Sequence, residues 1–133
     1  MAIGFINVKS NSRNEFIDIT EEVQKQIAEA GVAKGLVILY VPHTTAAITI
    51  NEGADPSVRY DIINTLSRLI PHVAGYRHME GNSDAHLKSS IIGVSVMVPI
   101  NEGSLVLGTW QSIYFCEFDG PRHRRVELKI ISG

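Results

Sequence analysis

The chain has 133 residues, of which 44% are hydrophobic and 20% charged, and its formal net charge is -2 at pH 7. This length is typical of one domain, so we expect a single domain over residues 1–133. The net charge argues against nucleic acid as the main partner, because proteins that follow phosphate backbones carry a basic stripe. No apolar run approaches the ~20 residues that span a bilayer, and the first residues lack a secretory signal, so we expect no membrane partner and a cytoplasmic location.

The first forty residues predict two strands, a helix and a third strand. Two apolar stretches flank the polar segment 9–14, and a hairpin is the simplest arrangement for them. Capping signals at Thr20 start a helix that Gly31 ends. Residues 36–41 are apolar without alternation, which indicates a central strand that is buried on both faces or partly covered by another subunit.

Polar residues follow this central strand directly. Pro42 cannot donate to a strand ladder, so pairing should weaken where the segment His43-Thr44-Thr45 begins. Polar groups at the end of a core strand are typical of a functional site. Taken alone, His43 also fits an ordinary edge histidine with satisfied hydrogen bonds.

Three carboxylates accompany the next strand and helix. Residues 46–50 predict a strand, and Asp55 followed by Pro56 predicts the start of a helix that ends near residue 70. Glu52, Asp55 and Asp61 lie close enough in the chain to bind a hard cation such as Mg²⁺. A helix cap and a solvated helix face are the commoner meaning of such residues.

Residues 76–93 combine two histidines with polar capping residues. Asp84 or Ser83 can cap a helix over residues 85–92, which places His86 in its first turn. His78 lies in the loop before it, so the two rings converge only if that loop folds back.

In the last third of the chain, apolar and polar residues alternate as they do in half-buried strands. We expect strands at residues 94–100, 105–109, 112–118 and from residue 124 onward, with Trp110 more typical of a core position. A period of two places Arg124 on the inward side of the last strand. An inward guanidinium needs an anion, which is either Glu117 across the hairpin or a charged ligand in a cavity.

About eight strands and three helices without regular alternation indicate an α+β, mainly β fold of antiparallel, sandwich-like sheets with helices packed outside. Three blocks of the chain resemble the YjbQ family of small proteins: VPHTTAAITINEGAD, YRHMEGNSDAHLKSSIIG and LGTWQSIYFCEFDGPRHRRVELKI. The resemblance covers about the last hundred residues, whereas the first thirty-five carry little of the pattern. It implies a homotrimeric, sandwich-like fold and weak thiamine-phosphate synthase activity, after which members of the family are named.

The resemblance also implies a metal-binding cluster of histidines, onto which His43, His78 and His86 map. Three neutral imidazoles suit zinc and leave a coordination position open. A synthase would instead use Mg²⁺ on carboxylates to neutralise the pyrophosphate that leaves, so Mg²⁺ is the alternative. Asp84, like Glu80 and Asn82, could orient a ligating ring.

A phosphate could bind at the helix start near residues 83–86 together with Arg124. We therefore predict Asp84, Glu52 and Arg124 as catalytic residues and a small phosphorylated or anionic molecule as the partner. Three functions stay open at this point: a synthase-like transferase, a non-catalytic trimeric protein that binds a small anion, and a metal-dependent hydrolase.

Overall fold

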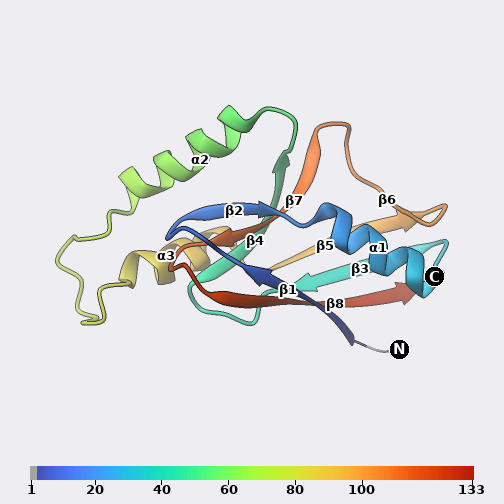
Figure 1. Cartoon of the computed structure of the whole chain (residues 1–133), viewed down its shortest axis with the longest axis horizontal. Helices are drawn as coiled ribbons and strands as arrows, with labels where there is room; N and C mark the ends of the chain where they lie inside the picture. Colours follow the sequence, from blue (N-terminus) through green and yellow to red (C-terminus); the bar gives the residue numbers. More distant parts are fainter. Residues whose placement is uncertain (1–2) are drawn as a thin grey trace.

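Two antiparallel sheets share one apolar core in the computed structural model, which describes residues 3–133 (Figure 1). The larger sheet has the strand order β1-β8-β3-β5-β6, and the smaller has the order β2-β7-β4. The strands are β1 (Ile3–Lys9), β2 (Glu15–Asp18), β3 (Gly35–Tyr40), β4 (Ala46–Glu52), β5 (Ser95–Asn101), β6 (Ser104–Leu105), β7 (Gln111–Glu117) and β8 (His123–Ser132). The predicted α+β, mainly β architecture of antiparallel strands is confirmed.

Three helices accompany the sheets: α1 (Thr20–Ala30), α2 (Pro56–Leu69) and α3 (Ser83–Ile92). Helix α1 ends at Gly31 in the left-handed conformation, with φ of 67°, as predicted. Asp55 caps α2 by accepting a hydrogen bond from the Ser57 main-chain N–H at 2.9 Å, also as predicted. None of the helices in residues 3–133 is long and apolar enough to cross a bilayer.

Helix α3 begins differently from the prediction. It starts at Ser83, and Asn82 is the residue before it, with no capping bond from a side chain. Neither Ser83 nor Asp84 is the cap, because Asp84 already lies inside the first turn and points its carboxylate into the protein. Gly93 ends the helix with a positive φ of 98°, a conformation that favours glycine.

The core between the sheets follows from the alternation of their strands. In β8 the buried residues are every second one, so Arg124, Val126 and Leu128 face inward while Arg125 and Lys129 are exposed. The cluster joins both sheets and α1 through Ile6, Val8, Ile19, Val23, Ile27, Val37, Leu39, Val41, Ala46, Ile48, Val98, Ile100, Ile113, Phe115, Val126 and Leu128.

A second, smaller cluster covers the other face of the β2-β7-β4 sheet. Its buried members are Phe16, Ala47, Ala85, Tyr114, Cys116 and Phe118, and side chains of α2 pack against it. None of the residues of α2 is fully buried. In Figure 1 this helix runs along the top of the fold, and the chain then turns at the left end before it enters α3.

Three local predictions were wrong. Strands β1 and β2 do not form a hairpin, because β1 pairs with β8 and β2 with β7, in different sheets. The strand expected at residues 105–109 is reduced to Ser104–Leu105, which pairs with β5. Trp110 is not in the core and leaves 64% of its surface exposed, since it lies in a turn before β7.

Strand β3 is central in its sheet, between β8 and β5, as predicted. Its two faces differ: Val37 and Leu39 are fully buried, whereas Leu36 and Tyr40 are exposed. Met97, on the neighbouring strand β5, is 65% exposed. Burial on both faces within one chain is therefore excluded for β3, and the outer face of this sheet is apolar and open.

Candidate functional site

The candidate site lies where β3 ends and β8 begins. The Val41 N–H donates to the Val94 carbonyl at 2.8 Å, and the chain then leaves the sheet at Pro42. His43 follows this exit, and Arg124 is the second residue of β8. Helix α3, which packs against β4, brings His86 to the same place.

The ring of His43 is fixed by one hydrogen bond. Its Nε2 accepts from the main-chain N–H of Arg125 at 3.1 Å. Its Nδ1 makes no hydrogen bond to residues 3–133 and is not among their buried unsatisfied atoms, so this nitrogen reaches solvent. Burial, followed by the positive charge of Arg124, lowers the pKa of His43, which keeps the ring neutral at pH 7.

Arg124 is 8% exposed and is paired with Glu117, the predicted partner. The hairpin expected between these residues is not formed, because β7 and β8 belong to different sheets. Its Nε donates to Glu117 Oε1 at 2.9 Å, and its Nη2 donates to Glu117 Oε2 and to Thr45 Oγ1. Burial alone would raise the pKa of the Glu117 carboxyl, but the bonds from Arg124 and Ser10 lower it. The inward guanidinium thus has a structural partner.

One part of the Arg124 guanidinium remains free. Its Nη1 makes no hydrogen bond within the described chain and is not a buried unsatisfied atom there, so it reaches solvent. Glu117, by contrast, is fully buried. The pair therefore presents a donor outward and keeps its negative partner inside.

Two hollows adjoin at His43, since both are lined by Tyr40, His43 and Thr44. The larger, of about 570 Å³, extends to His86, Ser89 and Ser90 on α3. The smaller, of about 450 Å³, is also lined by Pro42 and Arg124. Together they have the size of a small-metabolite site, with an arginine at one end and a histidine at the other.

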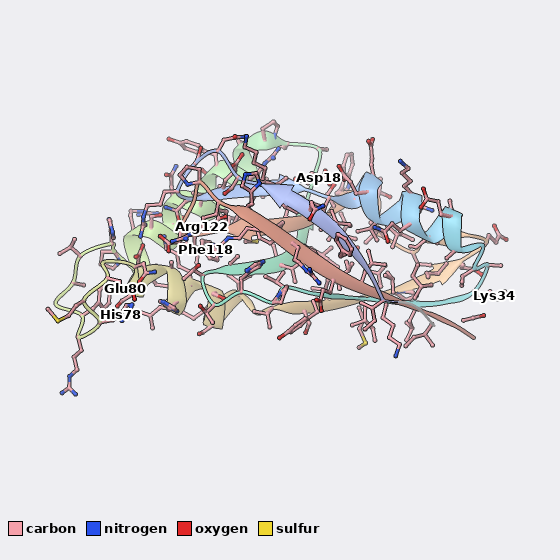
Figure 2. The ribbon with its side chains drawn as sticks, turned by 60° about the horizontal axis from the view of Figure 1, so that its bottom comes forward. Asp18, Lys34, His78, Glu80, Phe118 and Arg122 are labelled. Atoms are coloured by element: carbon pink, nitrogen blue, oxygen red, sulfur yellow. The ribbon has the colours of Figure 1, made fainter. Side chains whose placement is uncertain are left out.

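His78 and His86 lie close together, so the loop before α3 folds back as their convergence requires. Their ring centroids are 5.4 Å apart and the rings are nearly perpendicular, at 89°. Both line a third hollow, of about 360 Å³, beside Tyr76 and Leu87. Figure 2 places His78 and Glu80 at one end of the molecule, and the His78 Nε2 to Glu80 Oε2 distance is 3.9 Å.

The three histidines are thus brought together in pairs and not as one set. His86 shares one hollow with His43 and another with His78. Within residues 3–133 of a single chain, no three His, Cys, Asp or Glu side chains are grouped so that they could hold a metal ion. The binding of zinc or Mg²⁺ stays a prediction.

Asp84 has a different role from the capping and orienting roles expected of it. Its two carboxylate oxygens accept from Arg13 Nη1 and Nη2 at 2.8 and 2.9 Å, and Lys88 Nζ lies 3.7 Å away. Burial would raise the pKa of this carboxyl, but the bonds and charge of Arg13 lower it. Lys88 also donates to Asn14 and Ser67, so the group ties α3 to α2 and to the segment before β2.

The three carboxylates near α2 serve as caps or lie on its surface. Glu52 Oε2 accepts from the Ala54 N–H at 2.8 Å, and Asp55 caps the helix. Asp61 lines a shallow groove along α2 with Val58 and Thr65. The reading of these residues as caps and helix surface is the one that the structure supports.

Sequence reasoning missed the residues that hold the site in place. Ser10 and Arg13 lie in the polar segment taken for a hairpin turn, yet Ser10 bonds Glu117 and Arg13 bonds Asp84. The loop between α2 and α3 is closed by His72 Nε2, 2.7 Å from the Gly81 carbonyl, and by Tyr76, whose hydroxyl donates to Pro71 at 2.6 Å. These contacts join distant or irregular segments, which carry no periodic signal.

Comparison with known proteins extends the resemblance over nearly the whole chain. The model of the family described as UPF0047 protein YjbQ-like matches residues 5–133, including residues 5–35, where little of the pattern was expected. A UPF0047 protein of Methanocaldococcus jannaschii is 56% identical over 93% of this chain and 90% of its own length. The UPF0047 protein YugU of Bacillus subtilis is 49% identical over 95% of this chain and 96% of its own.

Solved structures agree with the fold. The crystal structure of an uncharacterised conserved protein of the YjbQ/UPF0047 family from Clostridium acetobutylicum has a TM-score of 0.94 and 51% identity, covering 96% of this chain and 98% of that one. A hypothetical protein from Aeropyrum pernix has a TM-score of 0.95 and 39% identity over the full length of both chains. The chain therefore belongs to the YjbQ (UPF0047) family.

Proposed function

We propose that this YjbQ-family protein binds a small phosphorylated metabolite in the two hollows that adjoin at His43. The observation that carries the proposal is the free Nη1 of Arg124, a charged donor of a residue that lines a hollow of about 450 Å³. A guanidinium with free N–H groups is the usual partner of a phosphate group. The adjoining hollow, which extends to His86, has room for the rest of the molecule.

The electrostatics support binding of moderate strength. Arg124 is already neutralised by Glu117, and His43 is neutral, so the hollows carry little net positive charge. We therefore expect inorganic phosphate, which fills only the end near Arg124, to bind with a Kd on the order of 1 mM. A phosphate ester that also contacts the α3 side should bind more tightly.

Calorimetric titration with inorganic phosphate and glycerol 3-phosphate tests this proposal. The wild-type protein should bind glycerol 3-phosphate more tightly than inorganic phosphate and should not bind glycerol. His86→Ala should reduce this preference and leave the affinity for inorganic phosphate unchanged. His123→Ala, at an exposed position of β8, is the matched control. Equal heats for glycerol 3-phosphate and sodium chloride would contradict the proposal.

Catalysis is a separate question. Weak thiamine-phosphate synthase activity, metal-dependent hydrolysis and catalytic roles for Glu52, Asp84 and Arg124 stay predictions. The bonds of Glu52 to Ala54 and of Asp84 to Arg13 favour structural roles for these two carboxylates. Binding without turnover is accordingly the function that the geometry supports best.

We also propose that the protein assembles with copies of itself, as a homotrimer. The support is the open outer face of the larger sheet, where Leu36, Tyr40 and Met97 are exposed side chains on adjacent strands. Light scattering should give about three times the chain mass of 14.6 kDa. Met97→Lys should shift the mass toward the monomer, and a wild-type monomer at high concentration would refute the assembly.

A further inference from the structure

The hydrogen bond of His43 conflicts with the metal role expected for this residue. The Arg125 N–H donates to Nε2, so this nitrogen provides its lone pair to that bond and carries no proton. A neutral imidazole carries one proton, which must then be on Nδ1. A metal ion needs a nitrogen with a free lone pair. Neither ring nitrogen of His43 offers one.

The donor of this bond is fixed by the sheet. Arg125 is paired with Asn7 of β1 on one side, while β3 ends on the other side at Tyr40, opposite Glu127. The ring of His43 occupies the place where β3 would have continued to provide acceptors for β8. Moving the proton to Nε2 would set two N–H groups against each other, so the Nδ1–H form is the only neutral form that this arrangement accepts.

The smaller hollow therefore presents hydrogen-bond donors. Arg124 and His43 both line it, and each has one nitrogen, Nη1 and Nδ1, that is free of bonds to residues 3–133 and open to solvent. Glu117, the carboxylate that pairs with Arg124, is fully buried and does not line the hollow. Donors without an exposed carboxylate suit an oxyanion and disfavour a cation.

We infer that His43 binds a phosphate-type oxyanion as a hydrogen-bond donor through Nδ1–H, beside Nη1 of Arg124, and is not a metal ligand. The inference builds on the proposed function and specifies its chemistry: the ligand group is a tetrahedral oxyanion with acceptor oxygens for both donors. The inference concerns His43 alone. His78 and His86, whose rings adjoin each other, accept no main-chain hydrogen bond of this kind among residues 3–133.

Nitrogen NMR of the full-length, ¹⁵N-labelled protein tests the metal half of the inference. Long-range ¹H–¹⁵N spectra at pH 7 should show Nε2 of His43 unprotonated and Nδ1 protonated, and this pattern should persist when Zn²⁺ alone is added. If added Zn²⁺ changed the ¹⁵N chemical shift of a His43 ring nitrogen to that of a metal ligand, the inference would be overturned. Because this test needs no anion, it remains decisive even if the proposed function fails.

A pair of substitutions tests the donor half. His43→Asn keeps an N–H donor near the Nδ1 position, whereas His43→Ala removes it. With a chelator present, we expect the Kd for inorganic phosphate to rise less than about threefold in His43→Asn and about tenfold in His43→Ala, with His123→Ala unchanged. Equal losses in the two variants, with intact spectra of the fold, would refute the donor role. A wild-type protein that binds no phosphate would refute the proposed function itself.

Discussion

Two groups of buried charges in this protein use similar residues for different purposes. In the first, Asp84 is fully buried, both of its oxygens bond Arg13, and the Lys88 ammonium bonds Asn14 and Ser67. In the second, Arg124 bonds Glu117 and Thr45, keeps Nη1 free of bonds to residues 3–133, and lines a hollow. Under the proposed function, the donor that the Arg124 pair leaves free distinguishes it from the Asp84 group, whereas burial and lowered carboxyl pKa values are common to both.

The largest effect should come from breaking the second group. Glu117→Ala leaves the Arg124 guanidinium buried without a counter-charge, and we expect it to lower the free energy of unfolding by about 3–5 kcal/mol. The double variant Glu117→Leu with Arg124→Met should recover most of this loss, because it removes both charges. Urea unfolding measures the loss in the single variant and its recovery in the double variant. The double variant should also lose phosphate binding, and phosphate affinity that survives in it would contradict the role of Arg124.

Asp84→Asn should be less damaging. It weakens two charge-assisted bonds to a partly exposed arginine, so we expect a loss of about 2 kcal/mol by urea unfolding. Phosphate affinity should stay at the wild-type value, since Asp84 lines none of the hollows at His43. If the folded variant lost phosphate binding, the sequence-based prediction that Asp84 belongs to the site would be correct after all.

Acid should affect the two groups in the same direction. The pKa values of Glu117 and Asp84 are lowered in the fold from ordinary values of 4.5 and 3.8. Their contribution to stability is therefore fully present above these ordinary values and is lost as the pH falls below them. Urea midpoints measured from pH 7 to pH 3 should fall less steeply for the double variant of Glu117 and Arg124 than for the wild type. Parallel curves would show that the pair is not linked to acid unfolding.

The smallest effect concerns Asp55, which lies outside both groups. Asp55→Ala should lower the melting temperature because the cap of α2 is lost, whereas Asp55→Asn should leave it almost unchanged, since asparagine caps equally well. Thermal unfolding distinguishes the two variants. A loss of Mg²⁺ binding in Asp55→Asn at unchanged stability would instead support the cation site considered for this carboxylate.

The features that the sequence predicted correctly depend on neighbouring residues. The cap at Asp55, the helix end at Gly31 and the inward side of Arg124 each follow from residue type and strand or helix period. The partner Glu117 could be named because it lies only seven residues from Arg124, although β7 and β8 join different sheets and form no hairpin. Each of these contacts is formed within one or two successive elements.

The features that it could not predict depend on how the strands are assigned to sheets. The bond from Arg125 to His43 joins residues 82 apart, and that from Arg13 to Asp84 joins residues 71 apart. The first requires that β8 pairs beside β3, and the second requires that the segment between β1 and β2, which join different sheets, lies against α3. The apolar pattern of the sequence specifies neither arrangement. His43, His78 and His86 were expected as one set because the family resemblance implies it, whereas His86 shares one hollow with His43 and lies beside the ring of His78.

A crystal structure of the protein in the presence of phosphate would test the central claim most directly. We expect one phosphate in the smaller hollow, with oxygens at hydrogen-bond distance, about 2.7–3.0 Å, from Arg124 Nη1 and His43 Nδ1, and with the Arg125 bond to Nε2 intact. A metal ion bound to the ring of His43, or phosphate bound only elsewhere on the protein, would contradict it.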